Sequence, residues 1–122
     1  MKKILIIEDE DSLRKALVAR FQMEELEVLE ATNGEDGLVS IEEHGPDMIL
    51  LDIIMPKMDG ITMLKKLRTT DFGKDVPVLI MTNVDDAKSL YEGIANGAFD
   101  FLIKSNWGIG DMVKKVKNKL AE

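Results

Sequence analysis

The sequence predicts an α/β fold in which helices cover both faces of a parallel sheet. Two observations predict it. Short apolar runs alternate with segments of helical periodicity along 122 residues, and no linker or low-complexity tract interrupts them. The pattern forms five strand–helix units, and right-handed crossovers between parallel strands place helices on both faces of the sheet. The length fits one domain over residues 1–122.

The first unit begins with residues 3–7, an unbroken apolar run typical of a buried parallel strand. The following helix is expected to start at a cap provided by Asp11 or Ser12 and to run to about residue 24. Apolar residues four positions apart mark one face of that helix: Leu13, Leu17 and Phe21.

The second unit begins with residues 27–31, whose alternating polarity predicts an edge strand. Asn33-Gly34 then predicts a turn into a helix that ends at Gly45-Pro46. Residues 47–52 are the third expected strand. The segment 55–60 contains Met-Pro and Asp-Gly and is expected to be a loop before a helix over Ile61, Leu64 and Leu67.

Residues 78–82 are the fourth expected strand. The next helix is expected to start at Asp85 or Asp86 and to end at Asn96-Gly97. Residues 99–103 are the last strand. The final helix has a clear amphipathic pattern, carried by Ile109, Met112, Val113, Val116 and Leu120.

Composition excludes several classes of protein. A formal net charge of −7 argues against direct nucleic-acid binding by this domain. The chain has no cysteine and one histidine, which excludes disulfides and sites rich in either residue. Apolar runs of about five residues are far shorter than the roughly 20 that cross a bilayer. We therefore expect a cytoplasmic protein that does not bind membranes.

Polar residues follow the apolar runs, at the points where the strands should end. Glu8 and Asp9 follow the first run, Asp52 the third, Thr82 closes the fourth and Lys104 follows the fifth. Ligands of open parallel α/β sheets bind beside the carboxyl ends of the strands. The pattern therefore predicts acids, a hydroxyl and an ammonium group on one rim, as a phosphate-handling site would need.

These motifs resemble the receiver domain of two-component response regulators. The segments that carry the resemblance occur in order: Ile7-Glu8-Asp9, Leu51-Asp52-Ile53-Ile54-Met55-Pro56 with Asp59-Gly60, Met81-Thr82, and Gly97 to Lys104. The resemblance extends from the first strand to the last helix. It implies a flavodoxin-like, doubly wound (βα)5 fold whose five-stranded parallel sheet has the order 2-1-3-4-5.

The resemblance also implies a function. Asp52 would accept a phosphoryl group from a histidine kinase or a histidine phosphotransfer protein. Lys104 would pair with the phosphate, Thr82 would be the switch hydroxyl and Phe101 the switch aromatic. The domain would not be an enzyme, but a phosphoacceptor that assists its own phosphorylation and dephosphorylation. The chain ends one helix after Lys104, so output is expected through a protein target that binds the face formed by 85–121.

The chemistry of the rim agrees with these roles. A carboxylate can attack an activated phosphoryl group, and this transfer depends mainly on charge neutralisation. Mg²⁺ prefers oxygen ligands and keeps several waters. Asp9 and Asp52 can bind it directly, whereas Glu8, one methylene longer, is suited to act through a water. By resemblance, the third protein ligand is the backbone carbonyl of Ile54.

Other interpretations remain open. Singly, each residue has an ordinary explanation, such as a solvated charge run, a loop cap or a surface lysine. A flavodoxin-like module would hold FMN, but it needs a Ser/Thr/Gly-rich loop after the first strand, where residues 8–11 would repel its phosphate. A phosphatase would need a second acid at Ile54. A third alternative is a receiver-like interaction scaffold that works without phosphorylation.

Some positions depart from the family pattern. Ser105 follows Lys104 where the family usually has proline, often after a cis peptide bond. Asn83 replaces the usual alanine or glycine after the threonine. By resemblance, Ile54 and Val84 flank the path of the water that would hydrolyse the phosphoryl group. Both are apolar and branched, so we expect the phosphorylated state to decay slowly.

Overall fold

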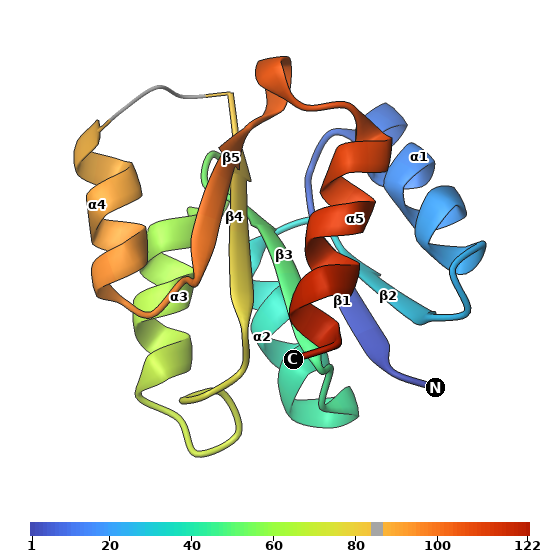
Figure 1. Ribbon diagram of the computed structural model, residues 1–122. Helices are drawn as coiled ribbons and strands as arrows, with labels where there is room; N and C mark the ends of the chain where they lie inside the picture. The colour runs from blue at the N-terminus through green and yellow to red at the C-terminus, as the bar shows by residue number, and fades with distance from the viewer. Residues whose placement is uncertain (84–86) are drawn as a thin grey trace.

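The computed structural model describes residues 1–83 and 87–122, and within them five parallel strands form one sheet of order β2-β1-β3-β4-β5 (Figure 1). The predicted topology is confirmed. The strands are β1 (Lys3–Ile7), β2 (Glu27–Ala31), β3 (Met48–Asp52), β4 (Val78–Thr82) and β5 (Asp100–Ile103). Their carboxyl ends all lie at the upper end of the molecule in Figure 1, and both chain termini lie at the lower end.

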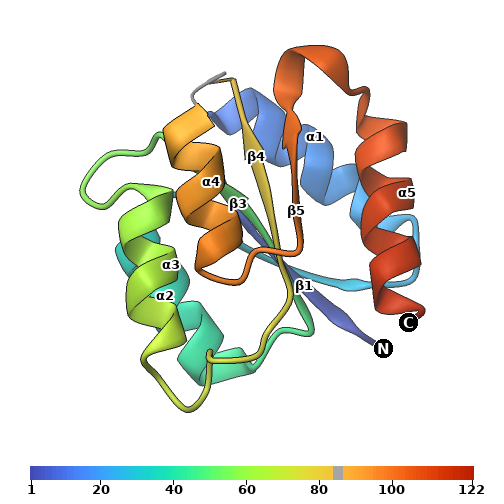
Figure 2. The ribbon, with the colours of Figure 1, turned by 60° about the vertical axis from the view of Figure 1, so that its left-hand side comes forward.

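Helices cover both faces of the sheet, as Figure 2 shows with the sheet seen nearly edge-on. Their bounds are α1 (Asp11–Gln22), α2 (Gly34–His44), α3 (Gly60–Arg68), α4 (Ala87–Ala95) and α5 (Ile109–Leu120). Helices α1 and α5 pack on one face, and α2, α3 and α4 pack on the other. None of the helices in the described part of the chain is both long enough and apolar enough to cross a membrane.

The core has two layers because each central strand points its side chains to both faces in turn. Strands β3 and β4 are buried along their whole length, which explains their unbroken apolar runs. Strands β2 and β5 lie at the sheet edges and are partly exposed. Phe21 of α1 and Met112, Val113 and Val116 of α5 fill one layer. Met63, Leu64 and Leu67 of α3 fill the other.

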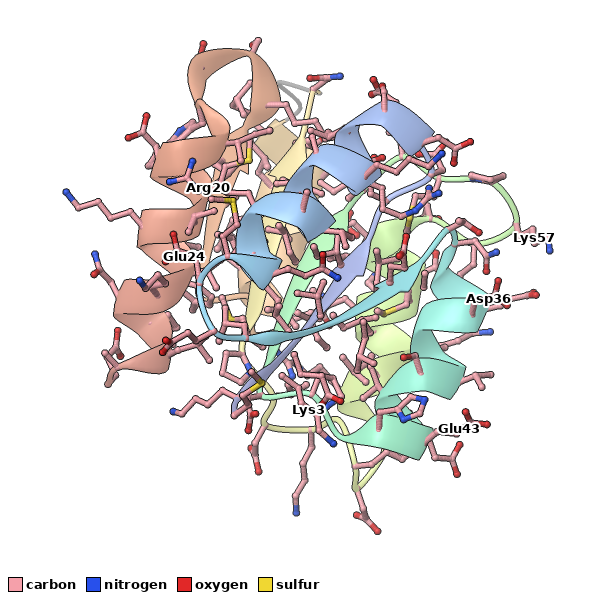
Figure 3. The ribbon with its side chains drawn as sticks, turned by 90° about the vertical axis from the view of Figure 1, so that its right-hand side faces the viewer. Lys3, Arg20, Glu24, Asp36, Glu43 and Lys57 are labelled. Atoms are coloured by element: carbon pink, nitrogen blue, oxygen red, sulfur yellow. The ribbon has the colours of Figure 1, made fainter. Side chains whose placement is uncertain are left out.

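Figure 3 views the molecule toward the β2 edge, where α1 and α5 lie together. Arg20, in the last turn of α1, and Glu24, just after that helix, are on the side near α5. The Glu24 carboxylate accepts a hydrogen bond of 2.8 Å from Nζ of Lys117 on α5. Lys57 projects from the loop between β3 and α3 with a φ of 66°, a left-handed backbone that is uncommon for a residue with a side chain.

The helix ends follow local capping chemistry, with one correction to the sequence analysis. Asn33 and Asp59 cap α2 and α3, since their side chains accept hydrogen bonds from the backbone N–H groups of Asp36 and Thr62, both at 2.9 Å. The prediction that Asp11 or Ser12 caps α1 is wrong. Asp11 is already the first helical residue, and the cap position is Glu10 with no side-chain hydrogen bond.

The predicted start of the fourth helix at Asp85 or Asp86 lies outside the described residues, as does Val84. Helix α4 is described from Ala87. After β5 the chain enters a short 3₁₀ turn over Lys104–Asn106. All peptide bonds of the described residues are trans, including the bond between Lys104 and Ser105.

Candidate phosphate and metal site

The strand ends bring the predicted polar residues to one cavity of about 220 Å³ at the carboxyl edge of the sheet. The cavity contains every predicted site residue except the switch aromatic. It is lined by Glu8, Asp9, Glu10, Asp52, Ile54, Thr82, Asn83 and Lys104. These residues lie at or just after the ends of β1, β3, β4 and β5, so a pattern spread over almost 100 positions of sequence converges in space.

Asp52 is the last residue of β3, and its side chain is almost fully buried at the base of the cavity. The backbone around it is held by the start of α3, where the Gly60 N–H donates a hydrogen bond of 2.7 Å to the carbonyl of Ile53. A Cβ atom at position 60 would lie 2.2 Å from the carbonyl oxygen of Asp52. Only glycine therefore lets the start of α3 lie this close to the backbone of Asp52. Gly60 of the Asp59-Gly60 pair thus helps to position the site.

Lys104 connects the two most deeply buried acids. Its Nζ donates a hydrogen bond of 3.1 Å to Oδ2 of Asp52 and another to Oε1 of Glu8. The lysine side chain is only 9% exposed. Burial alone would lower the pKa of Lys104, but the hydrogen bonds to Glu8 and Asp52 and their charges raise it above its ordinary value. The ammonium group therefore stays charged at neutral pH.

Glu8 has no exposed surface, and both of its carboxylate oxygens have hydrogen-bond partners. Oε1 accepts from Lys104, and Oε2 accepts from the backbone N–H of Glu10 at 3.1 Å. Burial raises the pKa of Glu8 from about 4.5 to about 7, against the opposing effect of these two hydrogen bonds; the charge of Asp52 also raises it. The protonation of Glu8 therefore changes near neutral pH.

The acidic residues suit a hard divalent cation. One carboxylate oxygen each from Glu8, Asp9 and Asp52 lies within 4.8 Å of the others. This all-oxygen set matches the ligand preference of Mg²⁺. Because both oxygens of Glu8 already have partners, that residue is better placed to act through a water than as a direct ligand. Ile54 lines the same cavity and is 62% exposed, so its apolar side chain faces the mouth of the site.

Thr82 and Phe101 lie on the same side of the sheet but in different surroundings. Thr82 is fully buried at the end of β4 and lines the acidic cavity. Phe101 pairs with Ile80, two residues before Thr82, and is 37% exposed. It lines a separate apolar hollow with residues of α4: Ala87, Leu90, Tyr91 and Ile94. The structure therefore places Phe101 outside the cavity that contains the predicted phosphate site.

The residues that depart from the family pattern occupy defined places. Asn83 lines the cavity beside Thr82. Ser105 lies in the 3₁₀ turn that follows Lys104. Trp107 is partly buried against the layer that contains α1 and α5. The Nζ of Lys115 lies 5.4 Å from the centre of its ring.

The sequence analysis missed three residues that build the site. Gly60 was seen only as part of a loop signal, and Glu10 only as part of a charge run. Arg14 was missed although a signal existed. It stands three residues before Leu17 and seven before Phe21, and these three are the buried residues of α1. An arginine on the buried stripe of an amphipathic helix indicates a partner inside the protein.

Comparison with known proteins agrees with this geometry. Residues 4–117 match the family model described as the response regulator receiver domain. The chain is 35% identical over 104 residues to the transcriptional regulatory protein AfsQ1 of Streptomyces coelicolor, a match that covers 85% of this chain and 45% of that protein. The chain spans less than half the length of the first curated relatives it matches.

Solved structures show the same likeness over nearly the whole chain. A putative response regulator from Chloroflexus aurantiacus superposes with a TM-score of 0.89 at 31% identity, covering 99% of this chain and 98% of that one. A CheY-like receiver domain protein from Methanospirillum hungatei superposes with a TM-score of 0.92 at 25% identity, covering 99% and 94%.

Proposed function

This chain belongs to the response regulator receiver domain family of two-component systems, and we propose that Asp52 is its phosphoacceptor. The observation that carries the proposal is the convergence of Asp52, Lys104, Glu8 and Asp9 on one cavity. A buried carboxylate is placed there beside a fixed ammonium group and a set of oxygen ligands. Such an arrangement neutralises a transferring phosphoryl group, which is the main requirement of this chemistry.

The proposed reaction is a phosphoryl transfer to the Asp52 carboxylate. One carboxylate oxygen attacks the phosphorus of a phosphohistidine on a histidine kinase or a phosphotransfer protein. The new O–P bond makes an aspartyl phosphate as the P–N bond of the donor breaks, and the bonding electron pair leaves with the imidazole. With acetyl phosphate as donor, a P–O bond breaks and acetate leaves. Lys104, whose Nζ lies 3.1 Å from Oδ2 of Asp52, would pair with the phosphoryl oxygens.

Asp9 and Asp52 would hold Mg²⁺ directly, Glu8 would act through a water, and the backbone carbonyl of Ile54 would complete the protein ligands. When bound, Mg²⁺ supplies positive charge against the phosphoryl oxygens. Three acidic residues with clustered oxygens support this assignment. Thr82, which lines the same cavity, would donate a hydrogen bond from its hydroxyl to a phosphoryl oxygen once one is present.

We propose that output passes to a protein target at the face formed by α4, β5 and α5. The apolar hollow between Tyr91, Ile94 and Phe101 lies on this face, and all three side chains are more than a third exposed. Apolar surface of this kind is typical of protein contact sites. Phe101 lies on β5 and Thr82 on the neighbouring strand β4. A change at Thr82 can therefore reach the target surface through the contact between these two strands.

The decisive experiment is incubation with acetyl phosphate and Mg²⁺, followed by mass spectrometry of the intact protein. The wild type should gain one phosphoryl group that is stable to acid and labile to base. Asp52→Asn should gain none, whereas the matched control Asp71→Asn, in an exposed loop, should react like the wild type. Undiminished phosphorylation of Asp52→Asn would contradict the assignment, and absence of phosphorylation in the wild type would favour a phosphorylation-independent scaffold.

A further inference from the structure

Arg14 is one of the few buried charged residues in the described part of the chain, and it does not line the acidic cavity. Its side chain is 9% exposed although it carries a full charge. Its hydrogen bond to Asp11 raises the pKa of the guanidinium against the effect of burial, so it is permanently charged. A buried guanidinium needs partners for its N–H groups, and the identity of these partners shows what it holds in place.

Each nitrogen of the guanidinium contacts a different segment. NH1 donates to the backbone carbonyl of Glu8 at 3.0 Å, Nε donates to Oε1 of Glu30 at 2.9 Å, and NH2 donates to Oδ1 of Asp11 at 2.6 Å. Glu30 belongs to β2, Asp11 begins α1, and Glu8 follows β1. The planar fork of arginine therefore ties the end of β1 to the strand and the helix beside it.

The contact with Glu8 is the one that reaches the site. The Glu8 N–H donates to the carbonyl of Ala31 at 3.0 Å, so the backbone of Glu8 is held by β2 on one side and by Arg14 on the other. The carbonyl of Glu8 lies in the same rigid peptide plane as the nitrogen of Asp9. A guanidinium that fixes this oxygen therefore also fixes the direction in which Asp9 leaves the strand.

We propose that Arg14 is a positioning residue for the magnesium site, which orients Asp9 through the peptide bond between Glu8 and Asp9. The proposal rests on the proposed function, because that function assigns the metal to Asp9 and Asp52. Residues that orient metal ligands from behind typically contribute 10- to 100-fold to metal affinity. Arg14 meets the structural requirement for this role, since it is buried, charged and bonded to the backbone of the ligand segment.

Charge alone predicts the opposite effect, and this makes the proposal testable by its sign. A cation near the acidic cluster repels Mg²⁺, so its removal should strengthen Mg²⁺ binding if Arg14 acts only through its field. If Arg14 orients Asp9, its removal should weaken Mg²⁺ binding although a repelling charge has gone. A purely structural role would lower the free energy of unfolding and leave the affinity of the folded protein unchanged.

The test compares Mg²⁺ binding by wild type, Arg14→Lys and Arg14→Met, measured by calorimetry without any phosphodonor. Circular dichroism at the temperature of the titration ensures that only folded protein is titrated. We expect Arg14→Met to bind Mg²⁺ about 10-fold more weakly than wild type. Arg14→Lys keeps the positive charge but loses the planar guanidinium, and its Mg²⁺ affinity should be intermediate between those of wild type and Arg14→Met. Equal or tighter binding by Arg14→Met would overturn the proposal.

Two further measurements keep the outcome unambiguous. If Arg14→Met does not fold, the Mg²⁺ affinity of Arg14→Lys alone tests the proposal. An affinity equal to that of wild type would show that the positive charge suffices without the guanidinium, and would overturn the proposal. In the metal-free protein, hydrogen exchange of the Glu10 amide, which bonds to Oε2 of Glu8, should be faster in Arg14→Lys than in wild type. A wild type that binds no Mg²⁺ would contradict the proposed function itself, whereas unaltered Mg²⁺ binding in the variants would contradict only the role of Arg14.

Discussion

The Nζ atom of Lys104 lies 3.1 Å from Oδ2 of Asp52 and also donates to Oε1 of Glu8, so one ammonium group joins acids at the ends of two different strands. The lysine supplies the charge that allows two buried carboxylates to remain close together. A divalent cation in the same cavity would serve the same purpose. We therefore predict that Lys104 and Mg²⁺ compete for the same negative charge in the unphosphorylated protein.

Replacing Lys104 should separate its stabilisation of the two carboxylates from its competition with Mg²⁺. Lys104→Met leaves Glu8 and Asp52 without their cation, and we expect the metal-free protein at pH 8 to lose about 3 kcal/mol of unfolding free energy. Its affinity for Mg²⁺ should rise, because the competing charge has gone. Denaturant unfolding and calorimetry measure the two effects.

The control Lys74→Met, at an exposed position, should change stability by less than about 0.5 kcal/mol. Weaker Mg²⁺ binding in Lys104→Met would refute the competition.

Deprotonation of Glu8 should make the metal-free protein less stable as the pH rises toward neutrality. The pKa of Glu8 is about 7 in the folded protein and has an ordinary value of about 4.5. Between these values the folded state binds the extra proton, so the stabilising contribution of Glu8 is complete below about pH 4.5 and is lost as the pH passes 7. Glu8→Gln removes this contribution, and the difference in unfolding free energy between wild type and variant should fall across this range. A difference that is constant from pH 5 to pH 8 would contradict the shift.

The same protonation should couple to the metal. Mg²⁺ favours the ionised form of Glu8, so its binding near pH 6 should release a proton and its affinity should increase up to about pH 7. Calorimetry in buffers of different ionisation enthalpy measures the released proton directly. In Glu8→Gln the release should be reduced, and an equal release in both proteins would assign the proton to another group.

Much of this site follows from the sequence because strand ends converge wherever a parallel sheet is predicted. Glu8, Asp9, Asp52, Thr82 and Lys104 lie at such ends, and their meeting needs no knowledge of side-chain contacts. The contacts that cross between segments are harder to predict.

The clearest example of this difficulty is the start of α1. Asp11 resembles a helix cap in the sequence, but in the fold its carboxylate bonds to Arg14 and helix α1 begins at Asp11 itself. A local capping preference is worth about 1 kcal/mol. Here it yields to the ion pairs that the buried Arg14 guanidinium makes with the exposed carboxylates of Asp11 and Glu30. The close approach of Gly60 to Asp52 likewise depends on how the β3–α3 loop folds back, which composition does not specify.

Gly60→Ala should disrupt the acceptor. The added Cβ would lie 2.2 Å from the carbonyl oxygen of Asp52, so the loop or the start of α3 must move. We expect a loss of about 2 kcal/mol in unfolding free energy, together with slower phosphorylation by acetyl phosphate. Gly110→Ala is the matched control on α5, where the nearest atom would be 3.8 Å away. It should be neutral or stabilise the protein by up to about 1 kcal/mol. Equal effects of the two substitutions would contradict the role of Gly60.

Phosphorylation should move Phe101 through Thr82. The two side chains lie on the same side of neighbouring strands, with Phe101 partly exposed and Thr82 buried in the cavity wall. As the hydroxyl moves toward the phosphate, the aromatic ring should turn inward and bias an existing equilibrium. A Phe101→Trp reporter in a Trp107→Phe background should shift its emission to shorter wavelength on phosphorylation. Thr82→Ala should abolish the shift, whereas Thr69→Ala, outside the cavity, should preserve it. A shift that persists in Thr82→Ala would show that Phe101 responds by another route.

The lifetime of the phosphorylated state should depend on Ile54. Hydrolysis requires a water in line with the phosphorus, and the side chain of Ile54 is 62% exposed at the mouth of the cavity. An apolar branched side chain at the mouth can crowd this water and cannot orient it by hydrogen bonding. The wild type should therefore lose its phosphoryl group slowly by the standards of receiver domains, and Ile54→Asn should lose it faster. Val84, the second residue expected to flank the water, lies outside the described residues, and Val84→Glu should act in the same direction.

Asn83 provides the internal control for this argument, because it also lines the cavity and its amide can orient a water by hydrogen bonding. Decay of phosphorylated protein is followed by mass spectrometry after the donor is removed by desalting. If Ile54 limits the approach of water, Ile54→Asn will decay faster than wild type whether or not Asn83 is replaced by alanine. If Asn83 positions the water, Asn83→Ala will decay more slowly and will cancel the effect of Ile54→Asn. Equal or slower decay of Ile54→Asn with Asn83 intact would show that the apolar side chain does not protect the phosphoryl group.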